Sequence, residues 1–410
     1  MLRTIIRNGF LSKKGAFFDK YSFRFLFFSL IFLLFFSMSC PAEKVGILLP
    51  GKEGDWEKAG CYLEEQLDAA GVTAEIICSG NDAGKQKEDL LRLIPEKPDL
   101  LLLAAVDPAD IEKTAEKAVR TGIPVISCDR PVMSRKIPWC VTFDSRQAGE
   151  LQGEFLADLL DLDHARDAVY RVEFLCGSRV SDEEPVREEK GGGRQETGRQ
   201  ETDGQDMEGQ PGDGRDEGGQ ICAGALEFLQ PYMDEGLLTS LAADPERMQD
   251  LPELECFLSL PELKKRYAGE PVLPDFILCA DGQTALDTAD WARERYQGRK
   301  PPLITAVGLD AELAGALRSG DVTMTAFCPW KYEAAAAVDL TLALLSGEMI
   351  SQDWVEHAGF PFECCLGNRF GSGDLQNDTL LLRPETVTGN NLEKILYLYK
   401  EDEPQTDPGF

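Results

Sequence analysis

The feature that most constrains this chain is a regular alternation of short, continuously apolar runs with longer amphipathic stretches. Apolar runs of this length are typical of strands that are buried on both faces of a sheet, and the amphipathic stretches are typical of the helices that cover it. Glycine or proline often marks the change from helix to strand. The alternation runs through both halves of the sequence and predicts an α/β protein with two doubly wound lobes.

The expected elements follow one another in the order that a parallel sheet requires. Strands are predicted at 44–50, 74–79, 100–106, 124–128 and 139–143, and again at 169–177, 274–281, 303–310 and 322–327. The main helices are predicted at 55–70, 84–93, 108–121, 145–160, 223–235, 284–297, 311–319 and 331–346. Ligands of doubly wound domains bind at the carboxyl ends of the strands. Two Rossmann-like lobes joined by a hinge therefore predict a ligand cleft between two sets of strand ends.

The order of the segments suggests how the chain divides between the lobes. We expect the N-terminal lobe at 44–143, with residues 328–350 returning to it, and the C-terminal lobe at 144–327. Residues 351–400 would cross the hinge, and 401–410 would form a tail.

The strand and helix pattern stops between residues 180 and 220. This stretch contains no aromatic residue and repeats the pentapeptide GRQET. Such a segment buries too little apolar surface to offset the entropy lost on ordering. The sequence therefore predicts a disordered acidic insertion within the C-terminal lobe.

The first 39 residues differ from the rest of the chain. Six basic residues and one acid precede or flank the apolar run FLFFSLIFLLFFSM, which is followed by Ser39 and Cys40. This arrangement is typical of a lipoprotein signal peptide, which would leave a diacylated Cys40 at the mature N-terminus. A membrane-spanning helix is the alternative, but it needs about 20 apolar residues. We therefore expect an exported protein, periplasmic or on the outer face of the cell membrane, held by a lipid anchor.

Charge and cysteine usage exclude several classes of function. The net charge of −30 repels nucleic acids, so a nucleic-acid partner is not expected. The 12 cysteines show no CxxC spacing and the chain has only two histidines, so neither a metal site nor a disulfide framework is predicted. There is no GxSxG or HExxH motif either. We therefore expect no catalysis, no cofactor and no bound metal.

Acidic residues stand at the ends of the apolar runs of four predicted strands. They are Asp129, Asp144, Asp281 and Asp310. Carboxylates accept hydrogen bonds from neutral hydroxyls, and Arg130 can donate in a rigid fork, so adjacent hydroxyls of a polyol can be matched. Trp56, after the first strand, can offer an apolar face to a sugar ring. Each aspartate could instead cap the helix that follows it, but the recurrence at four equivalent points favours a polyol site.

Several segments resemble the periplasmic sugar-binding proteins of ABC transporters, especially their xylose-binding branch. The resemblance lies in KVGILLPGKEGDWEKAG, ISCDRPV, WCVTFDSRQAGELQGEFLADLL, GLDAELAGALRSGDVTMTAFCPW and LLLRPETVTGNN. It covers nearly all of residues 44–396, apart from the acidic insertion and residues 237–273. It implies the type I periplasmic-binding-protein fold, in which a monomer closes on one sugar and presents it to a membrane permease.

By this resemblance, the ligand contacts would be Trp56, Asp129, Arg130, Asp144, Asp281 and Asp310. Arg130 would make the main contact, with Asp129 beside it and Asp310 opposite. The chain departs from the family at several site positions, for example at Ser145, where relatives often have asparagine, and at Cys328, where lysine is usual. Two alternatives stay open: a sensory receptor that signals to a membrane kinase or chemoreceptor, and a degenerate surface lipoprotein that binds nothing.

Overall fold

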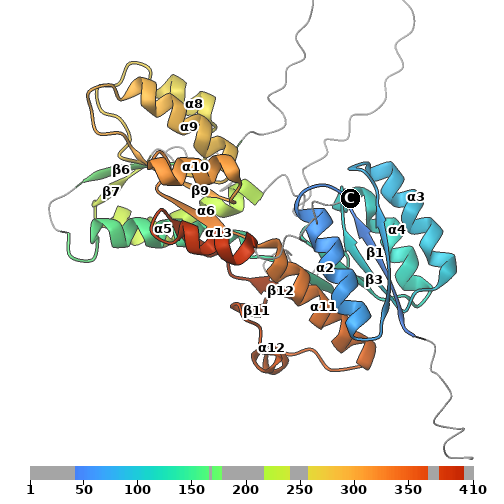
Figure 1. The fold of residues 1–410 in the computed structure, drawn as a ribbon. Helices are drawn as coiled ribbons and strands as arrows, with labels where there is room; N and C mark the ends of the chain where they lie inside the picture. The colour runs from blue at the N-terminus through green and yellow to red at the C-terminus, as the bar shows by residue number, and fades with distance from the viewer. Residues whose placement is uncertain (1–41, 166–168, 178–216, 241–256, 368–377, 401–410) are drawn as a thin grey trace, which may run out of the picture. The chain divides into compact units, whose positions relative to one another are not determined.

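The computed structural model describes most of the chain in five stretches (Figure 1). They are residues 42–165, 169–177, 217–240, 257–367 and 378–400. The predicted signal peptide at 1–39, Cys40 and the tail at 401–410 lie outside the described residues, as does the predicted insertion up to residue 216. Among the described residues, no helix combines the length and the apolar character needed to cross a membrane.

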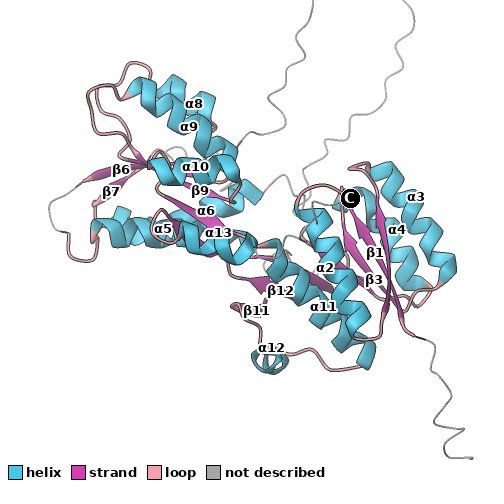
Figure 2. Cartoon of the chain, in the orientation of Figure 1, coloured by secondary structure: helices cyan, strands magenta, loops and turns pink. Residues whose placement is uncertain are grey.

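The first sheet has seven strands in the order β11-β12-β5-β4-β3-β1-β2. They are β1 (Lys44–Leu49), β2 (Thr73–Cys78), β3 (Leu100–Ala104), β4 (Val125–Cys128), β5 (Trp139–Phe143), β11 (Cys364–Gly367) and β12 (Asp378–Leu382). Neighbouring strands are parallel except for the antiparallel pair β11 and β12. Figure 2 shows these strands in magenta. Strand β3, an interior strand with the sequence LLLLA, is buried along its whole length.

Helices cover both faces of this sheet. They are α2 (Asp55–Ala69), α3 (Ala83–Leu93), η1 (Ile94–Glu96), α4 (Pro108–Arg120), α11 (Trp330–Ser346) and α12 (Gln352–Ala358). Because successive side chains of a strand point to opposite faces, Leu100 and Leu102 pack with α2 and α11, whereas Leu101 and Leu103 pack with α3 and α4. The four leucines of β3 therefore supply two hydrophobic cores at once.

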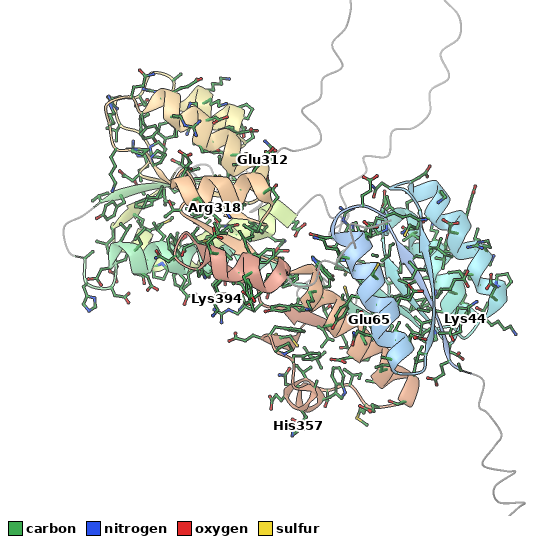
Figure 3. All side chains as sticks on the ribbon, viewed as in Figure 1. Lys44, Glu65, Glu312, Arg318, His357 and Lys394 are labelled. Atoms are coloured by element: carbon green, nitrogen blue, oxygen red, sulfur yellow. The ribbon has the colours of Figure 1, made fainter. Side chains whose placement is uncertain are left out.

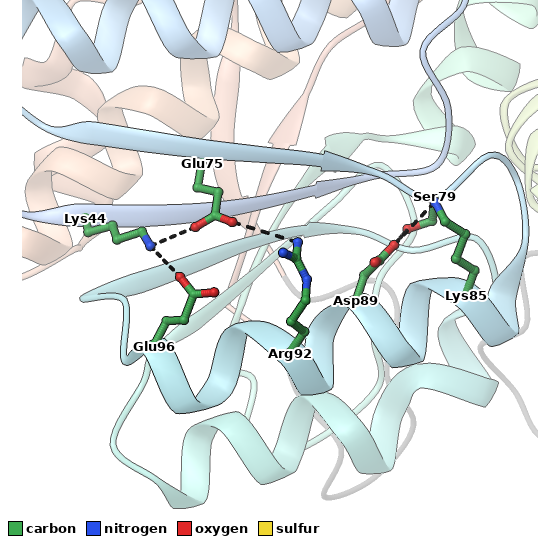
Figure 4. A network of polar contacts seen from close by, with 7 residues as sticks. All are labelled: Lys44, Glu75, Ser79, Lys85, Asp89, Arg92 and Glu96. Carbon is green, nitrogen blue, oxygen red and sulfur yellow. Dashed lines mark hydrogen bonds and ion pairs between the residues drawn. The ribbon is translucent and has the colours of Figure 1, made fainter.

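A group of charged side chains ties the start of β1 to its neighbours (Figure 4). The Nζ atom of Lys44 lies 2.7 Å from a carboxylate oxygen of Glu75 on β2 and 2.7 Å from one of Glu96 in η1. Arg92 of α3 lies 3.8 Å from the other oxygen of Glu75. Hydrogen bonds to Glu75 and Glu96 raise the pKa of Lys44, and the hydrogen bond from Lys44 lowers the pKa of Glu96. These ion pairs lie near the amino ends of the strands, on the side of the sheet opposite the carboxyl ends.

The second sheet has six strands in the order β13-β10-β9-β8-β6-β7. They are β6 (Tyr170–Leu175), β7 (Leu238–Thr239), β8 (Phe276–Cys279), β9 (Leu303–Val307), β10 (Met324–Phe327) and β13 (Glu385–Thr388). All pairs are parallel except β10 with β13. The helices of this lobe are α5 (Ser145–Leu160), α6 (Glu217–Asp234), α8 (Leu260–Arg266), α9 (Gly282–Arg295), α10 (Ala311–Ser319) and α13 (Leu392–Lys400). Helices α5 and α6 share one hydrophobic core, and α8, α9, α10 and α13 share another.

Helix α6 begins at Glu217, within the last residues of the predicted insertion and six residues before its predicted start at 223. Glycines of both helices let α6 pack closely against α5. A methyl group at Gly149 of α5 would lie 1.7 Å from the carbonyl oxygen of Ile221. One at Gly224 of α6 would lie 2.0 Å from the carbonyl oxygen of Arg146. One small residue on each helix thus lets the two backbones meet.

The chain passes between the two sheets three times, from β5 to α5, from β10 to α11 and from β12 to β13. The segment TLLLRPETVT belongs to the stretch 351–400, which is predicted to cross the hinge, and it supplies a strand to each sheet. Leu380, Leu381 and Leu382 are buried in the first sheet beside β5. The prediction of an α/β protein with two doubly wound lobes is confirmed.

Candidate functional site

A cavity of about 250 Å³ lies in the first lobe, between the sheet and the helices α2 and α11. We refer to it as the α2–α11 cavity. Its buried wall is apolar and includes Ile47, Leu63 and Leu102. The residues that end β4 and β5, Cys128 and Phe143, also line it, so the cavity reaches the carboxyl edge of the sheet. This is the edge at which doubly wound domains bind their ligands.

The polar part of the cavity lining is acidic. Asp55, Asp129 and Glu333 line it together with the aromatic side chains of Trp56 and Trp330. Asp55 begins α2 directly after Gly54, whose φ of +61° suits glycine at this turn. A carboxylate in the first turn of a helix is favoured by the helix dipole. The start of α2 therefore places both Asp55 and the half-buried Trp56 at the cavity.

Asp129 has an unusual backbone conformation, with a φ of +63°. Its N–H donates to the carbonyl oxygen of Val141 at 3.0 Å and to the Oε1 atom of Glu333. Its own carbonyl oxygen accepts from the Oγ1 atom of Thr142 at 2.6 Å. Left-handed conformations cost about 1–2 kcal/mol for residues other than glycine, and they are common where a side chain must be aimed for function. Three contacts from β5 and α11 hold Asp129 in this conformation.

Arg130 is anchored to the loop that follows β3. Its Nη1 atom donates to the carbonyl oxygen of Val106 at 2.9 Å. That loop is held in turn by the buried Gln86, which donates to the carbonyl of Ala104 at 2.9 Å and accepts from the N–H of Val106 at 2.8 Å. The Nε atom of Arg130 lies 3.8 Å from the carboxylate of Asp129. More than half of the Arg130 side chain is exposed, which leaves nitrogen donors available to a ligand.

Glu333 occupies the fourth position of α11, a helix whose next four residues are all alanine. Burial raises the pKa of its carboxyl well above the usual value, and the neighbouring Asp129 carboxylate raises it further. Burial also raises the pKa of Asp129, while Arg130 acts in the opposite direction. The two carboxyls therefore retain protons to a higher pH than exposed carboxyls do.

The other predicted site residues are helix caps. Asp144, which is 4% exposed, caps α5 by accepting from the N–H of Gln147 at 3.2 Å. Asp281 caps α9 through both of its oxygens, which accept from the N–H and the Oγ1 of Thr284. Asp310 caps α10 through one oxygen. These contacts match the capping interpretation that the sequence leaves open.

The structure thus brings together part of the predicted site. Trp56 and Asp129 line the same cavity, and Arg130 lies beside it. Asp144, Asp281 and Asp310 are not among the residues that line it, and their role as ligand contacts stays a prediction. Sequence reasoning did not find Glu333 or Trp330. A possible signal for Glu333 is that a single acid interrupts the apolar and alanine-rich start of α11.

Among the described residues, no group of three or more histidine, cysteine or acidic side chains is arranged to hold a metal ion. The ten cysteines of these residues are all free thiols. Burial raises the pKa of Cys128 and Cys328, which line the cavity, well above the usual thiol value. Both thiols therefore stay protonated at neutral pH and are poor nucleophiles.

Residues 45–182, which build most of this lobe, match the family described as the periplasmic binding protein domain. The matched stretch is 138 of the 410 residues. Over these residues, the match agrees with the resemblance seen in the sequence. A solved structure agrees with it: an ABC transporter solute-binding protein from Clostridium phytofermentans, with bound β-D-glucose, superposes with a TM-score of 0.62 at 20% identity, over 88% of this chain and 99% of that one. The periplasmic-binding-protein fold therefore extends over both lobes.

Two curated proteins match part of this chain. The multiple sugar-binding periplasmic protein SbpA of Azospirillum brasilense is 27% identical over 136 residues, which are 33% of this chain and 38% of that protein. The ribose import binding protein RbsB of Bacillus subtilis (strain 168) is 32% identical over 98 residues, which are 24% of this chain and 32% of that protein. The aligned stretches span about a third of each relative's own length. Both names describe binding proteins rather than enzymes, in agreement with the absence of enzyme motifs.

Proposed function

We propose that this chain is an extracytoplasmic solute-binding lipoprotein that binds a sugar or related polyol and delivers it to an ABC permease. The observation that carries the proposal is the α2–α11 cavity, where carboxylates and aromatic side chains meet at the carboxyl edge of a parallel sheet. The sugar-binding relatives support the same class of ligand.

The chemistry of the cavity suits a hydroxylated ring. The carboxylates of Asp129 and Glu333 can accept hydrogen bonds from hydroxyls, and the exposed part of Arg130 can donate to them. The faces of Trp56 and Trp330 can cover the C–H surface of a sugar. One face of the ring would thus be bound by apolar contact and its edge by charged hydrogen-bonding groups.

The second lobe would complete the site when the protein closes. Asp281 and Asp310 follow β8 and β9 and so stand at the carboxyl ends of the second sheet. The three connections between the sheets are few enough to act as a hinge. A bound ligand would contact both lobes in the closed state and one lobe in the open state. It would favour the closed state by the difference between its binding free energies in the two states.

Export and anchoring would place this receptor where a permease can reach it. The basic segment, the apolar run and Cys40 support processing as a lipoprotein, with the mature protein held as a monomer at the membrane surface. The permease, rather than a nucleic acid or a cofactor, would be its macromolecular partner.

A thermal-unfolding screen tests the proposed function. The chain without residues 1–40 is heated with pentoses, hexoses, disaccharides, polyols and nucleosides. A ligand at about one hundred times its dissociation constant adds about 2.7 kcal/mol to the free energy of unfolding, which raises the midpoint clearly. A midpoint raised by one sugar class supports the proposal, and no change across the whole panel would contradict it.

A further inference from the structure

The α2–α11 cavity carries negative charge with little to balance it. Of the three acids in its lining, Asp55 lies 3.5 Å from the Nζ atom of Lys58 and Asp129 lies 3.8 Å from Arg130. No lysine or arginine of the described residues lies within ion-pair distance of Glu333, and none belongs to the cavity lining. A neutral sugar would supply hydrogen bonds here but would leave this charge in place.

Two of the carboxylates belong to one small cluster. Glu333 reaches across from α11 and accepts from the backbone N–H of Asp129, which fixes its side chain at the end of β4. The raised pKa of both groups reflects their desolvation and, for Glu333, the nearby charge of Asp129. A carboxylate that has lost part of its hydration is stabilised either by taking up a proton or by a cation at close range.

The aromatic lining offers a second stabilisation for a cation. Trp56, Phe143 and Trp330 line the same cavity as the carboxylates. The rings of Trp330 and Tyr62 pack edge to face, with 6.3 Å between their centres. Aromatic faces attract cations, tryptophan most strongly, and the attraction grows when water is excluded.

We propose that the ligand of this site carries a protonated amine, as an amino sugar or an aminated polyol does, and that the amine lies between the carboxylates of Asp129 and Glu333. The inference rests on the proposed sugar-binding function and narrows it to a substrate class. The remaining hydroxyls of such a ligand would face Arg130 and the free carboxylate oxygens, while its ring would lie against the tryptophans.

Matched sugars test the inference. D-glucose, D-galactose and D-mannose are each compared with the corresponding 2-amino and 2-acetamido sugar by isothermal titration calorimetry, at a pH where the free amine is protonated. At least one amino sugar is expected to bind about tenfold or more tightly than its hydroxyl partner, because a charge-assisted contact replaces a neutral one. Acetylation removes the charge and should remove the advantage.

Variants assign the effect to the carboxylate pair. Glu333→Gln keeps the size and the acceptor oxygen of the side chain but not the charge, so the amine should lose its advantage while the hydroxyl partner still binds. Glu65→Gln makes the same change of charge on an exposed position of α2, outside the cavity lining, and should retain the advantage (Figure 3). Circular dichroism and the unfolding midpoint show whether each variant is folded. If Glu333→Gln does not fold, Asp129→Asn takes its place.

The outcomes separate this inference from the proposed function. Binding of neutral sugars with equal or weaker binding of every amine overturns the inference and leaves sugar binding intact. An amine advantage that survives the loss of either carboxylate charge also overturns it. If no member of the panel binds, both the inference and the proposed function are contradicted.

Discussion

At the scale of single residues, the site depends on how Asp129 and its neighbours are held rather than on which residues are present. Asp129 keeps a left-handed backbone because Val141, Thr142 and Glu333 all bind its peptide groups. Arg130 is fixed by Val106 on the adjacent loop. The Asp-Arg pair is therefore presented in one orientation before any ligand arrives, which lowers the entropy cost of binding.

Replacement of Arg130 by alanine should abolish stabilisation by the ligand while it leaves the apo protein folded. The side chain is more than half exposed, and surface replacements usually change stability by about 0.5 kcal/mol or less. The measurement is the unfolding midpoint with and without the sugar found in the screen. Arg92→Ala, which removes an exposed arginine that lies 3.8 Å from Glu75, is the control and should keep the full ligand response.

The stability of the apo protein should depend on pH through Glu333. Burial raises the folded-state pKa of this carboxyl above its unfolded value, so its contribution is fully present below the unfolded pKa and is lost as pH rises through the folded pKa. Glu333→Gln should therefore be more stable than the wild type at neutral pH, and the difference should shrink on acidification. Urea unfolding at a series of pH values measures it. A variant that is less stable at neutral pH would show that the carboxylate is stabilising as an anion.

At the scale of elements, helices α5 and α6 pack through glycine. Gly149 has no room for a side chain, because a methyl group there would lie 1.7 Å from a backbone carbonyl oxygen. Gly315 of α10 is exposed, with nothing within 4 Å of the position that a methyl group would take. Close packing thus requires glycine at position 149, whereas no neighbouring atom requires it at position 315.

The two glycines should respond to alanine with opposite signs. Gly149→Ala should destabilise the protein by about 1–3 kcal/mol, because α5 and α6 must move apart to accept the methyl group. Gly315→Ala should stabilise it by about 0.5–1 kcal/mol, since alanine is the better helix former. Chemical denaturation of both variants measures the pair. Equal effects would mean that the α5–α6 backbones can separate at little cost.

The sequence predicts those features of the fold that depend on residues close together along the chain. Helix α5 begins and ends at the residues expected, and β4 differs from its prediction by one residue, because apolar periodicity and capping are local signals. Strands β11 and β12 were not predicted, because their place in the sheet comes from pairing with each other and with β5. Glu333 was missed for the same reason: its hydrogen bond joins residues 204 positions apart.

At the scale of the whole molecule, the proposed anchor and the proposed receptor are separate parts of the chain. The strands of both sheets and the helices that cover them all come from residues 44–400. Loss of anchoring should therefore leave binding unchanged.

Replacement of Cys40 by alanine should release the protein from the membrane. The thioether that would carry the lipid cannot form, and the acidic lobes have little affinity for an anionic membrane surface. Fractionation of cells with an antibody, together with metabolic labelling by a radioactive fatty acid, measures the effect. A protein that stays membrane-bound without labelling would favour an uncleaved apolar segment over a lipid anchor.

The three passages of the chain between the sheets also set the order in which the lobes can form. The first sheet receives β11 and β12 from residues 364–382 and its cover helix α11 from residues 330–346, so its core is incomplete until most of the polypeptide has been synthesised. Pairings between residues so far apart make folding slow. Slow folding would suit the proposed export, because a chain that is still unfolded can pass through a secretion channel.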